Sequence, residues 1–359
     1  MKGLRGIVAV CMALCHLTLL AGVYEKVITY PSVDQHGDSL MLSGKVSVPL
    51  DRPAKGVILL LHYTIGANTE VPSSCTLVEA KQFRKDYILV MPDYIGYGNT
   101  KDRFPPYLHG ALTAQNSVDM LPAAQHLLDS LQLGISTDSL YLVGFSQGAA
   151  AALWTLKHLE EQCMDRYHVK HCFIGSGPYD VAATYDETVK SDKVGMPMAV
   201  PLLVMGTSTA YDLHLQREQL LTPELDQRFD ELIASKKHGL ISLYVRMQSH
   251  KLSTWLTATG RDKTQQETKR MYEGLLRSSL VHYSVDNSEI GKDSICPLWV
   301  PQAPLYVFHS TKDDVVSFCN AAHLQKRYPN EKNITYEFGN YGGHLHSLFK
   351  FLSRLKEKF

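Results

Sequence analysis

The sequence predicts an α/β fold in which a mostly parallel sheet is covered by helices on both faces. Three observations predict it. Short, continuously apolar segments recur along the chain, as expected of strands buried on both sides. Helical patterns follow most of these segments. The composition, 45% hydrophobic and 20% charged over 359 residues, is typical of a globular protein with a large core.

The charge balance excludes several classes of function. The chain has 36 Lys and Arg against 36 Asp and Glu, a formal net charge of zero. Nucleic-acid binding requires a surplus of basic side chains, so we expect no nucleic-acid partner. The ample apolar content and the absent net charge also argue against disorder.

Residues 1–22 have the features of a secretory signal peptide. Lys2 and Arg5 precede an apolar stretch, Ile7–Ala21, which ends in the small residues Ala21 and Gly22. A membrane-spanning helix needs about 20 apolar residues, and this stretch is shorter. We therefore expect a secreted or periplasmic protein without stable membrane insertion after the signal is removed.

The cysteines suggest neither a lipid anchor nor a metal site. Cys11 and Cys15 follow Val10 and Leu14, where lipoprotein signals carry a small residue, so a lipid anchor is possible but poorly supported. After cleavage an odd number of cysteines remains, and this leaves at least one thiol free. The remaining cysteines are Cys75, Cys163, Cys172, Cys296 and Cys319. Cys163 and Cys172 could pair in an oxidising compartment. His168, His171 and Cys172 match no standard spacing of metal ligands, and we expect no metal or other cofactor.

The predicted elements follow in chain order. Alternating apolar residues on both sides of a polar turn at His36–Asp38 predict an antiparallel hairpin over 23–49. Continuous apolar segments predict buried strands at 56–61, 87–91, 140–143, 172–174 and 305–308, with a further strand at 334–338. Apolar spacing predicts helices at 112–133, 149–159 and 316–325 and a closing helix to Phe359.

The interval of about 181–300 interrupts this alternation. It is far longer than an ordinary loop. Leu220, Leu221, Leu225, Phe229 and Leu232 have helical apolar spacing, and helical segments are expected at 217–235 and 242–256. We expect a helical cap inserted into a single domain of residues 23–359.

Ser146 is the candidate nucleophile. The segment Gly144–Phe145–Ser146–Gln147–Gly148 lies between a predicted buried strand and an Ala-rich helix. A sharp strand-to-helix turn strains the serine backbone and leaves no room for side chains two residues to either side, hence the glycines. Such a turn exposes the hydroxyl above the sheet, beside the positive end of the helix.

A serine nucleophile needs a base and an orienting carboxylate, and both have candidates further along the chain. Asp313 follows the strand 305–308, and the neighbouring Asp314 remains an alternative because spacing does not separate them. His344 follows a glycine pair after the last strand, with His346 as its competitor. The N–H groups of Gln147 and of Thr64, or of Tyr63 instead, are the candidate oxyanion donors.

With these residues placed, the chain resembles the α/β-hydrolases, and more narrowly the secretory lipase family and its bacterial esterase relatives. The matching pieces are residues 62–66, 72–73, 92–98 and 106–108 and the Ser146 turn. Two positions depart from the family pattern: Tyr63 stands where the family has glycine, and Glu70 and Val71 stand where it has a cysteine before Pro72–Ser73. The resemblance implies an α/β-hydrolase fold with a helical cap.

The sequence thus predicts a secreted serine hydrolase that cleaves small-molecule carboxylic esters through Ser146, His344 and Asp313. Two alternatives remain. The same machinery serves peptidases of the prolyl-oligopeptidase type, although no extra N-terminal domain is visible here. A hydrolase-fold binding protein without turnover is the second alternative, and it predicts a missing or misdirected catalytic residue.

Overall fold

A computed structural model describes residues 22–282 and 299–359 of the chain. Residues 1–21 of the predicted signal peptide lie outside the described residues, as does Cys296.

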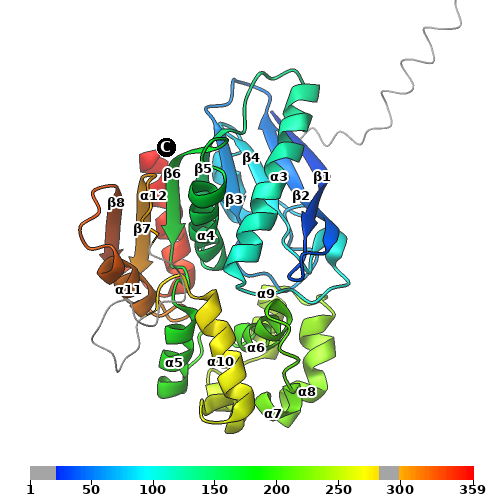
Figure 1. The fold of residues 1–359 in the computed structure, drawn as a ribbon, viewed down its shortest axis with the longest axis vertical. Coiled ribbons are helices and arrows are strands. Elements are labelled where there is room, and N and C mark those ends of the chain that lie inside the picture. Colours follow the sequence, from blue (N-terminus) through cyan, green and yellow to red (C-terminus); the bar gives the residue numbers. More distant parts are fainter. Residues whose placement is uncertain (1–21, 283–298) are drawn as a thin grey trace, which may run out of the picture.

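Eight strands form one sheet with the order β1-β2-β4-β3-β5-β6-β7-β8 (Figure 1). The strands are β1 (Val23–Val33), β2 (Ser39–Pro49), β3 (Val57–Leu61), β4 (Ile88–Pro92), β5 (Ser139–Phe145), β6 (His168–Gly175), β7 (Leu305–Ser310) and β8 (Ile334–Gly339). The hairpin β1–β2 is antiparallel, β2 pairs antiparallel with β4, and all other pairs are parallel. The prediction of a mostly parallel sheet is confirmed.

Helices cover both faces of this sheet, and the strands alternate between two apolar clusters. In β3, Val57, Leu59 and Leu61 belong to one cluster and Ile58 and Leu60 to the other, as the two-residue period of a strand requires. The first cluster includes residues of α3 (Gly110–Ser130), α4 (Gln147–Gln162) and α11 (Cys319–Arg327). The second includes residues of α2 (Val78–Phe83) and α12 (His344–Lys358).

Between β6 and β7 the chain forms a group of helices at one end of the sheet, and we name residues 181–281 the cap (Figure 1). Its helices are α5 (Val181–Ser191), α6 (Ala199–Ala210), α7 (Arg217–Leu220), α8 (Pro223–Phe229), α9 (Leu240–Arg246) and α10 (Gln266–Ser278), with short turns η2 (Asp230–Ala234), η3 (Leu252–Thr254) and η4 (Thr259–Arg261). The cap residues form most of a third apolar cluster, which includes Phe229, Trp255 and Met271 and also Tyr107 from the segment before α3.

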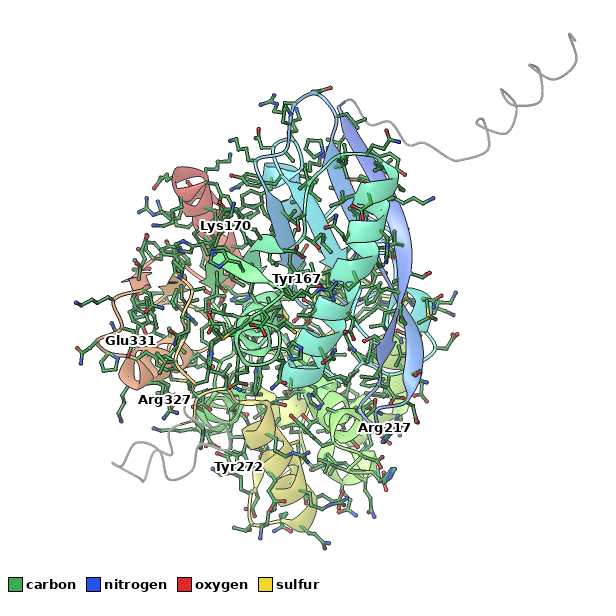
Figure 2. The ribbon with its side chains drawn as sticks, turned by 45° about the horizontal axis from the view of Figure 1, so that its top comes forward. Tyr167, Lys170, Arg217, Tyr272, Arg327 and Glu331 are labelled. Carbon is green, nitrogen blue, oxygen red and sulfur yellow. The ribbon has the colours of Figure 1, made fainter. Side chains whose placement is uncertain are left out.

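Polar contacts add to this packing within the cap. Figure 2 labels Arg217 and Tyr272, which both lie in it. Arg217 pairs with Asp226 of α8 at 2.5 Å, and Tyr272 of α10 donates to Asp186 of α5 at 2.7 Å. These contacts join α7 to α8 and α10 to α5.

The cap helices are shorter than the sequence pattern predicted. The segment 217–235 is divided because the chain is extended at Leu221 and Thr222 before Pro223 starts α8, and proline favours a first helical turn. The segment 242–256 is helical only to Arg246, since the backbone then pairs Lys251 with Lys193 and Leu256 with Leu221. Apolar periodicity did not reveal these long-range pairings.

Two further findings concern the cysteines and the membrane. Cys163 and Cys172, whose pairing the sequence left open, are both free thiols. Cys172 is buried in β6, where its Sγ lies 4.0 Å from the Ala152 carbonyl oxygen of α4. Within residues 22–282 and 299–359 we find no helix with the length and apolar character needed to cross a membrane.

Candidate functional site

Ser146 occupies the turn between β5 and α4 with φ 57° and ψ −124°, a strained conformation for a residue with a side chain. The glycines on either side are required sterically. A Cβ at Gly144 would lie 2.0 Å from the Gly148 carbonyl oxygen, and a Cβ at Gly148 would lie 2.0 Å from the Leu61 carbonyl oxygen. Only a backbone without side chains at these two positions can make this turn against the end of β3.

Ser146, His344 and Asp313 form one hydrogen-bonded chain. His344 Nε2 lies 2.9 Å from Ser146 Oγ, and His344 Nδ1 lies 2.8 Å and 3.0 Å from the two carboxylate oxygens of Asp313. Asp313 Oδ1 also accepts the N–H groups of Val315 at 3.0 Å and Val316 at 2.9 Å. The carboxylate is thus fixed by its own loop and oriented toward the ring of His344.

The two competing residues are placed differently. Asp314 Oδ1 accepts the backbone N–H of His344 at 2.8 Å, so it supports the start of α12 and not the imidazole ring. A Cβ at Gly343 would lie 2.8 Å from this same oxygen, which explains a glycine there. His346, two residues further along α12, is exposed, whereas His344 is buried.

Electrostatics favour an ionised acid beside the imidazole. Burial raises the pKa of Asp313, but its hydrogen bond and charge interaction with His344 outweigh burial and lower this pKa below its ordinary value. His309 of β7 is fully buried beneath the carboxylate, and its Nε2 lies 3.1 Å from the Val316 carbonyl oxygen. Burial lowers the pKa of His309 and so favours the neutral ring, although the Asp313 carboxylate 3.9 Å from Nε2 opposes this shift; Nε2–H donates to that carbonyl. His309 was not predictable from the sequence, because a histidine inside an apolar strand carries no signal of its own.

The candidate oxyanion donors lie on two adjoining segments. Gln147 is the first residue of α4, and the close approach of Gly148 to the carbonyl of Leu61 sets this helix against the end of β3. Thr64 is in the loop that follows β3, where its Oγ1 lies 2.7 Å from the hydroxyl of Tyr107. The hydroxyl of Tyr97 donates to the carbonyl of Ile65, the residue after Thr64, at 3.0 Å.

Asp93, within the piece 92–98, organises the base of this loop region. Its carboxylate accepts the Ser43 hydroxyl at 2.6 Å and the Ser73 backbone N–H at 2.9 Å. A Cβ at Gly98 would lie 2.3 Å from Asp93 Oδ2. The sequence showed this aspartate but not Ser43, which comes from β2 and reaches it only in the folded sheet.

Access to the site is narrow: Ser146 is only 6% exposed and His344 only 7%. A cleft of about 990 Å³ lies between the cap and the loop after β7 and is lined by Asp313 and Asp314 on one side and by Val194 and His250 on the other. This cleft reaches the acid end of the hydrogen-bonded chain and not Ser146. Among the described residues, no three His, Cys, Asp or Glu side chains are grouped so as to hold a metal ion.

Comparisons with known proteins agree with this architecture. The rice cell wall degrading esterase LipA from Xanthomonas oryzae is similar in structure, with a TM-score of 0.76 and 18% identity over 98% of this chain and 92% of that chain. A protein of Legionella pneumophila gives a TM-score of 0.76 and 21% identity over 95% and 90% of the two chains. Candida antarctica lipase A gives a TM-score of 0.63 and 15% identity over 93% and 77%. At these identities the likeness shows the fold alone.

Sequence comparison gives the family. No curated protein sequence matches the chain. The sequence model of the secretory lipase family matches residues 71–352, a span that includes the Ser146 turn, Asp313 and His344. The sheet with its antiparallel first strands, the strained serine turn and this match lead to one conclusion: the chain has the α/β-hydrolase fold and belongs to the secretory lipase family.

Proposed function

We propose that this protein is a secreted serine hydrolase that cleaves carboxylic esters through an acyl-enzyme intermediate. The observation that carries the proposal is the hydrogen-bonded chain from Asp313 through His344 to Ser146. Family membership supports ester hydrolysis in general. The roles of the individual residues follow from their hydrogen bonds.

In the first half of the reaction, Ser146 Oγ attacks the ester carbonyl while His344 Nε2 takes its proton. Asp313 holds the proton of His344 on Nδ1, so that Nε2 is free to accept, and it stabilises the imidazolium that forms. The N–H groups of Gln147 and Thr64 bind the tetrahedral oxyanion. His344 then protonates the leaving alcohol.

In the second half, water enters and His344 takes a proton from it as the water attacks the acyl carbonyl. The collapse of the second tetrahedral intermediate returns the proton to Ser146 Oγ and releases the acid. The proton that passes between Ser146 and His344 moves between Oγ and Nε2, which lie 2.9 Å apart in the structure.

Export and substrate choice complete the proposal. Residues 1–22 act as the signal peptide, and the cap, inserted within about 181–300, shapes the pocket for a small ester. N-terminal sequencing of the protein recovered from the periplasm or culture medium tests the first point. A mature chain that still begins at Met1 contradicts it.

The function is tested with a panel of p-nitrophenyl esters and aminoacyl amides. We expect the wild type to hydrolyse esters in preference to amides and Ser146→Ala to lose about 10⁴-fold or more in kcat. Ser117→Ala is the matched control, because Ser117 is also buried and donates to the carbonyl of Thr113 within α3. Preferred cleavage of the amides supports the peptidase alternative, and no turnover of either class supports a binding protein.

A further inference from the structure

One carboxylate, that of Glu70, joins the loop after β3 to the cap. Its Oε2 accepts the backbone N–H of Gly66 at 2.9 Å and lies 3.3 Å from the N–H of Ala67. The N–H of Leu240, the first residue of α9, lies 2.9 Å from Oε1 and 3.2 Å from Oε2. The same side chain therefore bonds the cap and the segment that begins two residues after Thr64.

The cap and this loop are also in direct contact. A Cβ at Gly66 would lie 2.5 Å from the carbonyl oxygen of His238 and 2.7 Å from Leu243 Cδ1. The N–H of Asn68 donates to the Lys236 carbonyl at 3.1 Å. Neither segment can shift by an ångström without disturbing the other.

A second contact, made by Lys236, joins the same part of the cap to the segment 96–103. The ammonium group of Lys236 donates to three carbonyl oxygens within 96–103 and lies 5.6 Å from the centre of the Tyr97 ring. The hydroxyl of Tyr97 in turn bonds the carbonyl of Ile65, next to Thr64. The loop after β3 is thus fixed on both sides by groups that depend on the position of the cap.

The carboxylate of Glu70 binds only backbone groups at this contact between the loop after β3 and the cap. Within the described chain Glu70 forms no salt bridge, and its carboxylate oxygens accept backbone N–H groups instead. Hydrogen bonds to an ionised acceptor are about twice as strong as neutral ones. A glutamine would offer one acceptor oxygen and would place an NH₂ donor at the other position, where it faces a backbone N–H. An amide oxygen at the Oε2 position would keep the loop bonds and only the longer 3.2 Å contact with Leu240, so the 2.9 Å bond from α9 to Oε1 would be lost.

We propose that Glu70 is a positioning residue that couples the position of the cap to the placement of the Thr64 N–H donor in the oxyanion hole. With the cap segment 236–243 in place, Glu70 fixes the N–H groups of Gly66 and Ala67 and so the orientation of Thr64. When that segment moves, the loop relaxes and the Thr64 donor is misplaced. This inference rests on the proposed function, because it assigns an effect on turnover to contacts remote from Ser146.

The coupling itself is tested by hydrogen–deuterium exchange, which needs no activity. In Glu70→Gln we expect amide exchange in peptides covering 64–68 and 238–243 to rise about tenfold. Glu160→Gln is the matched control, because Glu160 is also partly buried and accepts the N–H groups of Gln302 and Ala303. Unchanged exchange in 64–68 overturns the proposal whether or not the protein hydrolyses esters.

The consequence for catalysis is tested by kinetics. Misplacement by about 1 Å can cost about 100-fold, so we expect Glu70→Gln to lose 10- to 100-fold in kcat with KM for a short ester within threefold of wild type. Affinity for a trifluoromethyl ketone, which forms an oxyanion on the enzyme, falls in parallel with kcat/KM. A fall in kcat/KM that comes only from KM, or ketone affinity equal to that of wild type, contradicts a positioning role.

A pair of glycine variants perturbs the junction without changing any charge. Gly66→Ala places a methyl group 2.5 Å from the His238 carbonyl oxygen, between the loop and the cap. Gly260→Ala places one 2.5 Å from the Leu220 carbonyl oxygen, wholly inside the cap. We expect Gly66→Ala to lose kcat as Glu70→Gln does and Gly260→Ala to keep it. Equal losses of kcat in Gly66→Ala and Gly260→Ala contradict the coupling. If ester hydrolysis is retained in every variant, Ser146→Ala included, the proposed function is contradicted instead.

Discussion

Replacing Asp313 by asparagine separates the two adjacent aspartates and tests the role of His344. Asp313 Oδ1 accepts the N–H groups of Val315 and Val316, so the oxygen of an asparagine amide would be retained at that position. The amide NH₂ would then replace Oδ2, which lies 2.8 Å from His344 Nδ1. A donor facing Nδ1 forces the imidazole proton onto Nε2, the atom that must accept the proton of Ser146.

The expected loss follows from this wrong tautomer. A serine hydrolase whose histidine is held in the wrong tautomer loses about 10⁴-fold in kcat, which corresponds to about 5.5 kcal/mol of transition-state stabilisation. Asp314→Asn should stay within about threefold of wild type, because an amide oxygen can still accept the backbone N–H of His344.

The assay is steady-state hydrolysis of a p-nitrophenyl ester from pH 5 to 9, with thermal unfolding to show that both variants are folded. Asp313→Asn within tenfold of wild type refutes the assigned role of Asp313. An equal or larger loss in Asp314→Asn shows that the acid was assigned to the wrong residue.

Three further predictions use other parts of the structure. His344→Ala should abolish ester hydrolysis while His346→Ala keeps most of it, and the reverse pattern in kcat contradicts the choice of base. Gly148→Ala brings a methyl group 2.0 Å from the Leu61 carbonyl oxygen, so we expect loss of soluble protein or of nearly all activity; a folded variant with full kcat contradicts the steric account of the turn. Burial raises the pKa of Glu79 from 4.5 to about 7, so the folded protein favours the protonated carboxyl. The stability that this preference contributes is fully present below pH 4.5 and is lost as pH rises through 7. Glu79→Gln should therefore raise the unfolding free energy at pH 8 by about 3 kcal/mol and leave it nearly unchanged at pH 4, as measured by urea denaturation; equal effects at the two pH values contradict this.

Much of the fold could be predicted from the sequence because the signals for its elements are local. A strand buried on both faces is apolar at every position, as in residues 57–61, and such segments show without any knowledge of their partners. The serine turn also depends on neighbours in sequence, since Gly144 and Gly148 are required within one tight bend. These features need no long-range information.

Features that depend on tertiary contacts could not be predicted from the sequence. Spacing could not separate Asp313 from Asp314, because the choice is made by the N–H groups of Val315 and Val316 and by the start of α12. Cap helices were predicted too long because backbone pairing between distant segments ends them. Glu70 appeared only as a departure from a family pattern, and its bond to Leu240 joins residues 170 positions apart in the sequence.

The central claim is that Ser146 is the nucleophile, and covalent labelling tests it most directly. The full-length protein is treated with a fluorophosphonate probe, digested and analysed by mass spectrometry. We predict one adduct per chain, located on the peptide that contains Ser146, and no adduct in Ser146→Ala. Labelling of Ser146→Ala to the same extent as wild type, or a wild type that does not react, would contradict the account.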